Sequence, residues 1–241
     1  MSQVPTPVGH RHPLSAMIAE VNKIFTEIGF TFAEGPEREL VELNFDALNV
    51  PQNHPSRDMQ DTFYIAGQPE LVMRTHTSPV QVRFMRTHPL PIRMICPGKV
   101  FRNEATDATH EAQFFQLEGL MVDKDISLGH MKGVLEYFFS RLFGGIVEVR
   151  FRPSFFPFVE PGVEVDMKIA YNKDNKLSDK WIEVMGAGMV HPNVLQASGI
   201  DANLYQGFAF GMGLERLAVL KYGIDDVRLM YSGDLRFINQ F

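Results

Sequence analysis

Two short segments carry charged and amide side chains that neighbouring strands could bring together. The first segment holds Arg102 and Glu104, and the second holds Gln116 and Glu118. Because side chains alternate along a strand, each pair would lie on one face of its strand. Arginine can hold a phosphate or a carboxylate with two hydrogen bonds, and carboxylates can bind a metal ion or an amine. The pattern predicts a site for a polar ligand; an exposed sheet face with cross-strand ion pairs is the alternative.

A glycine-rich segment, residues 207–216, lies where a strand is expected to lead into a helix. Gly211 and Gly213 would let a ligand approach the backbone closely, and a helix N-terminus favours an anion. Arg216, in the first turn of that helix, could reach the same anion. The spacing matches neither the dinucleotide-binding glycine fingerprint nor a Walker A loop. An ordinary glycine-rich turn with a surface arginine is the alternative.

An aromatic run follows in the middle of the chain and contains Phe156 and Phe158, one residue apart. Two rings at this spacing could contact a flat ligand, since aromatic pairs stack favourably. The two prolines of the run predict a break in regular structure rather than a plain core strand. A packed sheet edge is the alternative.

A polar group of side chains, His76, Ser78 and Gln81, lies at a predicted strand-to-helix junction. These side chains could hydrogen-bond a small polar ligand. A Ser–His nucleophile lacks an obvious third member or nucleophile elbow. The eight histidines form no HExxH motif, so a metal hydrolase is disfavoured.

The composition excludes several classes of protein. The 241 residues are 45% apolar and 22% charged, which is typical of a globular protein. No stretch approaches the ~20 apolar residues of a membrane span, and no signal peptide is visible. The single cysteine excludes an internal disulfide and a thiolate zinc site, so we expect a cytoplasmic protein. The net charge of −6 disfavours nucleic-acid binding by bulk electrostatics.

The periodicity of apolar residues predicts the elements that position these groups. Helical spacing covers residues 14–28, 78–88, 128–142, 192–199 and 214–222, with Ser78 expected to cap the second helix. Strand patterns cover residues 30–32, 71–74, 92–96, 98–102, 114–122, 146–152, 163–171, 180–186 and 208–210. Residues 40–64 predict loops with a brief helix. This order predicts an α+β fold, an antiparallel β-sheet flanked by helices, rather than alternating βαβ units.

In order along the chain, these segments resemble the catalytic domain of class II aminoacyl-tRNA synthetases, and in particular the bacterial α subunits of phenylalanyl-tRNA synthetase. The helix over 14–28 with Gly35 and Pro36 resembles motif 1, residues 101–118 resemble motif 2, and residues 211–216 resemble motif 3. Sharper agreement comes from pieces specific to that family: His76–Ser78 with Gln81, Phe156–Pro161, Gly207–Gly211, Asn44–Leu48, Met189–Asn193 and Asp234–Phe237.

This resemblance implies a two-step reaction. Phenylalanine and ATP form phenylalanyl-adenylate and pyrophosphate, and the acyl group then passes to the 3′-terminal ribose of tRNA(Phe). Arg102 and Arg216 would be catalytic and would hold the α- and γ-phosphates. Glu104, His110 and Phe114 would complete the ATP site. Phenylalanine would be bound by His76, Ser78, Gln81, Gln116, Glu118, Phe156, Phe158 and Ala209, the last at the end of the pocket. Glu160 would bind Mg²⁺.

The resemblance also implies partners and boundaries. Residues 1–11 are expected to be an irregular lead-in, and residues 12–241 to be the catalytic domain. The family's α subunits pair with a β subunit in a heterotetramer, and without it we expect a homodimer or a poorly soluble monomer. The N-terminal coiled-coil arm of the family is absent from the matched stretch, so we expect adenylate formation to be intact and tRNA charging to be in question.

Two other functions remain open on the sequence. The first is a synthetase-like ligase that activates an amino acid for an acceptor other than tRNA. The second is a non-catalytic binding or regulatory paralogue, which is expected to have lost Arg102 or Arg216, yet both residues are present.

Overall fold

The computed structural model of the chain describes residues 9–103, 111–170 and 179–241. The predicted nucleotide-site residues Glu104 and His110 lie outside these residues. Within the described part, no helix is both long enough and apolar enough to cross a membrane.

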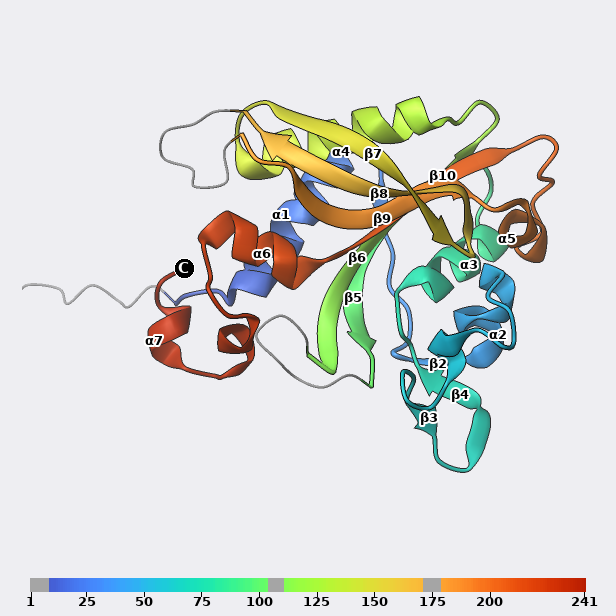
Figure 1. The fold of residues 1–241 in the computed structure, drawn as a ribbon, viewed down its shortest axis with the longest axis horizontal. Coiled ribbons are helices and arrows are strands. Elements are labelled where there is room, and N and C mark those ends of the chain that lie inside the picture. Colours follow the sequence, from blue (N-terminus) through green and yellow to red (C-terminus); the bar gives the residue numbers. More distant parts are fainter. Residues whose placement is uncertain (1–8, 104–110, 171–178) are drawn as a thin grey trace, which may run out of the picture.

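A seven-stranded sheet forms the centre of the molecule (Figure 1). Its strands, in spatial order, are β1 (Thr31–Phe32), β5 (Ile92–Phe101), β6 (Gln113–Asp123), β10 (Gln206–Gly213), β9 (Ile182–Val190), β8 (Val159–Ile169) and β7 (Val147–Phe156). All neighbours are antiparallel except β1 and β5, which pair in parallel. The predicted α+β class is therefore confirmed, and the sheet is mixed because of its first strand.

Three helices, α1 (Pro13–Glu27), α4 (Leu128–Phe143) and α6 (Leu214–Tyr222), share one hydrophobic core with the sheet. The start of α1 is fixed by Pro13 and by His12, whose Nδ1 accepts a hydrogen bond from the Leu14 amide at 3.2 Å. Phe25 of α1 stacks on Phe138 of α4 and Phe210 of β10, with ring centroids 4.8 and 5.7 Å apart. The core thus fixes the helices to the strands that carry the site.

A second, smaller core packs against the other face of the sheet, because Met94 and Leu120 of the inner strands β5 and β6 belong to it, whereas their neighbours Ile95 and Met121 belong to the first core. It is built from a three-stranded sheet and short helices: β2 (Arg38–Leu40), β4 (Gln68–Met73), β3 (Tyr64–Ile65), α2 (Val41–Asn44), α3 (Ser78–Thr87), α5 (Pro192–Ala197) and the 3₁₀ turns η1 (Asp46–Leu48) and η2 (Pro55–Arg57). The expected brief helix within 40–64 is present. The sequence pattern missed β2 and β3, which are too short to show a strand period.

The aromatic run adopts a tighter structure than predicted. β7 extends to Phe156 and β8 begins at Val159, so the run forms the tip of a hairpin. Pro161 is tolerated inside β8 because the pairing register with β9 shifts between Val159 and Gly162, where no ladder hydrogen bond is required. The predicted break in regular structure is confirmed at Pro157, which lies in the turn between β7 and β8, and was wrong at Pro161.

The glycines before α6 and the N-cap of α3 also differ from the prediction, although α6 itself spans the predicted residues. Gly211 and Gly213 belong to β10 rather than to a turn, and α6 begins at Leu214. The N-cap of α3 is Thr77, so Ser78 is its first helical residue and uses its hydroxyl elsewhere.

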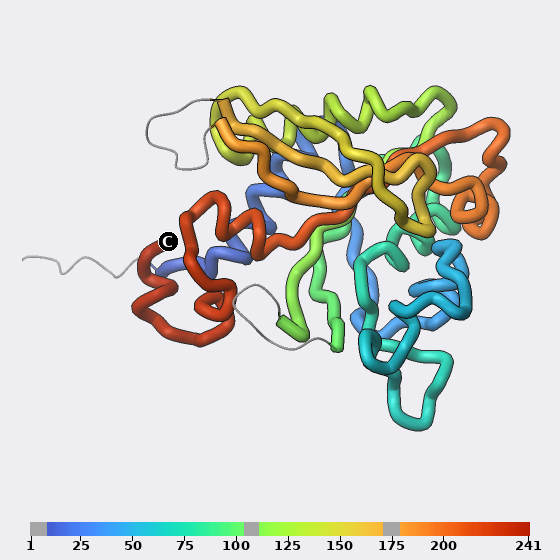
Figure 2. Tube along the Cα trace, viewed as in Figure 1, coloured from blue at the N-terminus to red at the C-terminus, as the bar shows by residue number. Residues whose placement is uncertain are grey.

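The C-terminal segment, with η3 (Val227–Tyr231) and α7 (Leu235–Ile238), lies beside the start of α1 (Figure 2). His12 Nε2 is 2.7 Å from the Met230 carbonyl oxygen. The buried carboxylate of Glu215 in α6 accepts hydrogen bonds from the Phe115 amide, at 2.7 Å, and from the Tyr231 hydroxyl. Burial raises the pKa of Glu215. One side chain thus joins α6, β6 and η3.

We expect Tyr231→Phe to lower the free energy of unfolding by about 1–3 kcal/mol, because a buried carboxylate loses one of its two donors. Tyr137→Phe is the matched control, since its hydroxyl donates to Glu27 at the exposed surface. Urea denaturation of both variants measures the difference. Equal losses in the two variants would contradict a special role for the Tyr231–Glu215 contact.

Candidate functional site

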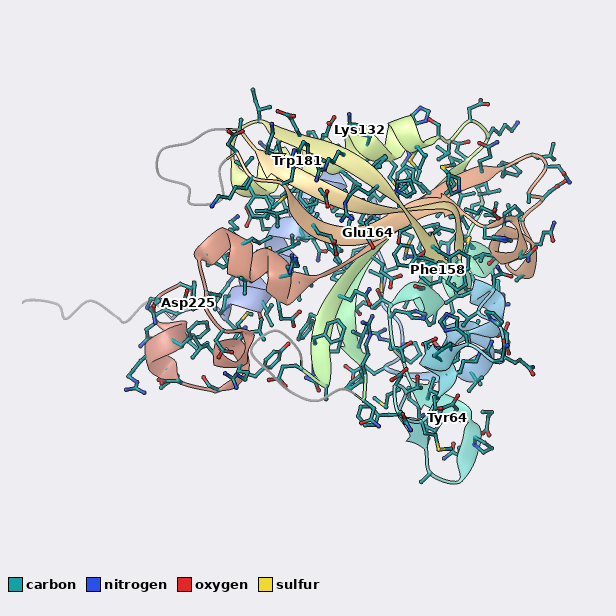
Figure 3. All side chains as sticks on the ribbon, viewed as in Figure 1. Tyr64, Lys132, Phe158, Glu164, Trp181 and Asp225 are labelled. Carbon is teal, nitrogen blue, oxygen red and sulfur yellow. The ribbon has the colours of Figure 1, made fainter. Side chains whose placement is uncertain are left out.

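A cavity of about 490 Å³ lies between the central sheet and the smaller core. Phe158, which lines it, lies where the two parts meet (Figure 3). Nine of the predicted site residues line the cavity: His76, Ser78, Gln81, Arg102, Gln116, Glu118, Phe156, Phe158 and Ala209. The structure therefore brings together groups that are up to 133 residues apart in the chain, counted from His76 to Ala209.

One end of the cavity is built around the buried carboxylate of Glu118, on β6. Its Oε2 accepts hydrogen bonds from the Ser78 hydroxyl at 2.6 Å and from Gln81 Nε2 at 2.8 Å. Its Oε1 accepts one from the Thr77 amide at 3.0 Å. Three donors from the start of α3 thus hold the carboxylate in place. Sequence reasoning missed Thr77, because a backbone donor leaves no mark on residue type.

The titratable groups at this end have strongly perturbed pKa values. Burial raises the pKa of Glu118 to about 7, against the opposing effects of its hydrogen bonds and of Arg74 and Arg102. Burial also lowers the pKa of His76 to about 3, assisted by the Arg102 charge. The imidazole is therefore neutral near pH 7. Glu118 is partly protonated at that pH, and a cation bound beside it would favour its ionised form.

Two polar atoms at this end have unmet hydrogen-bonding capacity. His76 Nδ1 and Gln116 Oε1 are buried and have no hydrogen-bond partner among the described residues. Buried polar atoms are rarely left unpaired, so these atoms point to a ligand. Together with Glu118, they suit a small molecule that carries an ammonium and a carboxylate.

Glycine on β10 leaves the space that these groups occupy. Gly211 pairs with Glu118 across the sheet. A Cβ at Gly211 would lie 3.1 Å from Gln116 Nε2 and 3.2 Å from Glu118 Cγ. Gly211 is therefore part of the floor of the polar end of the cavity, within a strand rather than in a turn.

The other end of the cavity is aromatic and apolar. The Phe156 and Phe158 rings lie 6.0 Å apart and 19° from parallel, and Phe158 is 6.2 Å from the His76 ring. A Cβ at Gly186 of β9 would lie 2.8 Å from the Phe156 ring, so glycine lets this ring lie against the sheet. Further apolar lining residues escaped sequence reasoning: Phe45, Leu48, Val50, Val159, Ala187, Val190 and Val194.

Arg102 lies directly after β5, at the cavity wall. Its Nε donates to the Thr75 carbonyl oxygen at 3.2 Å, and its guanidinium carbon lies 5.0 Å from the centroid of the Phe114 ring. Phe114 itself does not line the cavity. Arg102 therefore connects the cavity to the surface that carries the Phe114 ring.

Arg216 and Glu160 lie outside the cavity. Arg216 is exposed in the first turn of α6, as predicted, and its Nε donates to the Glu183 carbonyl oxygen at 2.9 Å. Glu160 is 74% exposed and its Oε2 lies 3.2 Å from His191 Nε2. Glu160 lines a second cavity of about 850 Å³ that shares Phe156 with the first. Among the described residues, no three His, Cys, Asp or Glu side chains cluster to hold a metal.

Comparisons with known proteins show the family of the chain. The family model of the tRNA synthetases class II core domain (F) matches residues 1–241. The phenylalanine–tRNA ligase α subunit of Bacillus subtilis is 54% identical over 98% of this chain and 70% of that subunit. The corresponding α subunit of Alkaliphilus metalliredigens is 55% identical over 97% of this chain and 70% of its own length.

Among solved structures, pyrrolysyl-tRNA synthetase from Desulfitobacterium hafniense has a similar fold. The TM-score is 0.71 at 18% identity, over 95% of this chain and 76% of that chain. The fold, the family model and the identity to named relatives lead to one assignment. The chain belongs to the class II aminoacyl-tRNA synthetases, in the family of phenylalanine–tRNA ligase α subunits.

Proposed function

We propose that this chain is the catalytic subunit of a phenylalanine–tRNA ligase, and that its cavity binds L-phenylalanine. The observation that carries the proposal is the joining, in one cavity, of the Glu118 carboxylate with the paired rings of Phe156 and Phe158. An aromatic amino acid needs both a partner for its ammonium and an aromatic or apolar surface for its ring. The names of the relatives support the same substrate.

The polar end would hold the backbone of the amino acid. Three donors already occupy Glu118, and a carboxylate accepts about four hydrogen bonds, so one position remains for the ammonium. The unpartnered Gln116 Oε1 would accept a second hydrogen bond from the ammonium. Neutral His76, with Ser78 and Gln81 beside it, would orient the substrate carboxylate toward Arg102.

The aromatic end would bind the ring of the substrate. Phe156 and Phe158 would pack on its faces and edges, and Ala209 would limit the depth of the pocket. The lining residues beside the two rings, Val159, Ala187 and Val190, have no polar side chain that could bind a para-hydroxyl group. Phenylalanine is therefore favoured over tyrosine, which would lose hydration of its hydroxyl without replacement.

The first reaction joins two anions, which repel each other in water. One oxygen of the phenylalanine carboxylate attacks the α-phosphorus of ATP, the P–O bond to the β-phosphate breaks, and pyrophosphate leaves. Arg102 would hold the α-phosphate beside the carboxylate and offset the developing charge. Arg216 would hold the γ-phosphate, and Phe114 would stack on adenine. Glu104 and His110 complete the proposed ATP site on the resemblance alone.

The second reaction transfers the acyl group to tRNA. A hydroxyl of the 3′-terminal ribose attacks the acyl carbon, the bond between that carbon and the phosphate oxygen breaks, and AMP leaves with the oxygen. The hydroxyl proton passes to the leaving phosphate or to water. Both steps need alignment rather than a side-chain nucleophile. The relatives carry the name α subunit, so we propose assembly with a β subunit; this chain spans 70% of their length.

Mg²⁺ fits the single carboxylate of Glu160, because this ion is commonly held by one or two carboxylates and by substrate phosphates. When bound, it would neutralise phosphate charge. Glu160 faces a second cavity next to Phe156, so it could hold the ion beside the ATP phosphates while the amino acid fills the first cavity.

Calorimetric titration with L-phenylalanine and 3-phenylpropionate, which lacks the ammonium, tests the amino-acid site. Protonation of Glu118 removes the partner of the ammonium, and its pKa is about 7, so L-phenylalanine affinity should fall as the pH falls through this value. Bound ammonium favours the ionised carboxylate, so binding below about pH 7 should release a proton. Equal affinity and equal pH dependence for the two ligands would overturn the proposal.

A further inference from the structure

Arg74, between β4 and α3, is a buried arginine that lies outside the cavity lining. Its side chain is held by backbone carbonyl oxygens. Nε donates to Lys99 at 2.7 Å, and Nη1 donates to Gly35 at 3.0 Å and to Pro36 at 3.4 Å. One guanidinium thus joins β5 to the segment before β2.

The backbone of Arg74 makes two further links to the same segments. Its amide donates to the Glu37 carbonyl oxygen at 2.9 Å, and its carbonyl oxygen accepts from the Phe101 amide at 2.9 Å. The residues that follow Phe101 and Arg74 make a third link between the same two segments: Arg102 Nε donates to the Thr75 carbonyl oxygen at 3.2 Å. Arg74 therefore lies at the crossing between the strand end that carries Arg102 and the loop that leads to His76.

Glycine at position 98 leaves room for this side chain. A Cβ at Gly98 would lie 2.3 Å from Arg74 Nη2 and 3.4 Å from Thr77 Cγ2. Gly98 lies in β5 opposite Gln116 of β6, within the strand pair that forms the polar end of the cavity. A glycine of β5 therefore makes the space that the Arg74 guanidinium occupies.

We propose that Arg74 is a positioning residue, which fixes Arg102 against the loop that carries His76 and Ser78. This inference rests on the proposed function of the cavity. Because the acceptors of its side chain among the described residues are neutral carbonyls, Arg74 also leaves its positive charge behind the polar end of the cavity. Loss of the side chain should therefore disturb both alignment and charge.

The charge acts on Glu118 together with its other neighbours. Arg74 and Arg102 both lower the pKa of Glu118, against the larger effect of burial. Across the sheet, Cys96 of β5 pairs with Glu118, and burial raises its thiol pKa to about 12, so it stays neutral. From α3, Ser78 and Gln81 donate to the carboxylate, and from β10 Gly211 presents no side chain.

Two substitutions separate alignment from charge. Arg74→Lys keeps the charge and loses the planar fork, whereas Arg74→Met loses both. Arg93→Met is the matched control, because it removes an arginine at an exposed position of β5, the strand that Arg74 contacts. Phenylalanine-dependent exchange of pyrophosphate into ATP, followed against pH and corrected by active-site titration, gives kcat and kcat/KM for phenylalanine.

We expect both Arg74 variants to lose about 10²-fold in kcat, because small misplacements of Arg102 are costly. In Arg74→Met alone, the acid limb of kcat/KM should move upward by about one pH unit, since Glu118 loses a neighbouring cation. The inference would be overturned if the variants kept the wild-type kcat and the wild-type acid limb of kcat/KM. It would also be overturned if the variants lost only active protein, with kcat and the acid limb unchanged in the remainder. A wild-type chain, with its β subunit, that shows no exchange would instead overturn the proposed function.

Discussion

Arg102→Ala is expected to slow adenylate formation by about 10²–10³-fold, the usual effect of removing a preorganised donor to developing charge. The guanidinium lies between the cavity and the Phe114 ring and is anchored by Thr75. At a pH well above the pKa of Glu118, L-phenylalanine should still bind, because the carboxylate and its three donors remain. Rapid-quench measurement of a single turnover isolates the chemical step.

Arg102→Lys and Arg86→Ala complete this experiment. The lysine variant keeps the charge without two-point contact, so its rate should lie between those of wild type and the alanine variant. Arg86 pairs with Glu42 at the surface, so its removal should leave the rate unchanged. A rate for Arg102→Ala within about threefold of wild type would contradict the role of Arg102 in the first step.

Glu118→Gln is expected to weaken L-phenylalanine binding by about 100-fold or more, or about 3 kcal/mol. The substitution removes the carboxylate that Ser78 and Gln81 hold at the polar end of the cavity. The new amide NH₂ group would also face the hydrogen-bond donors of Thr77, Ser78 or Gln81, and two donors cannot bind each other. Calorimetric titration with L-phenylalanine measures the loss.

The same variant should lose the pH dependence of phenylalanine binding near pH 7, because Glu118 is the group that titrates there. Glu70→Gln, at an exposed position of β4, is the control and should bind like wild type. Unchanged affinity in Glu118→Gln, in a protein that melts at the wild-type temperature, would show that the ammonium binds elsewhere.

Much of the fold and the polar site follows from local sequence. The apolar spacing of α1 and α4 and the strand patterns predict a sheet flanked by helices, because each element must bury one face. The side chains of Gln116 and Glu118 share one face of β6, and the start of α3 supplies the hydrogen-bond donors to Glu118. Residue type and spacing predicted these groups, because charged and amide side chains on one strand face need hydrogen-bond partners if that face is buried.

Other parts depend on tertiary contacts that local pattern does not encode. Val190 and Val194 line the cavity, but their residue type is the same as that of packed core residues, so the sequence does not distinguish the two. Gly211 and Gly98 resembled turn or strand glycines, yet each is required by a side chain of another strand. The buried Arg74 reads as a surface residue until the carbonyls that hold it are known.

The most direct test of the central claim is exchange of labelled pyrophosphate into ATP by the wild-type chain, alone and assembled with a β subunit. Arg102→Ala supplies the background. Exchange that requires L-phenylalanine, and that tyrosine and 3-phenylpropionate do not support, is the predicted result. Folded protein that binds L-phenylalanine but catalyses no exchange in either state would contradict the claim that this cavity activates the amino acid.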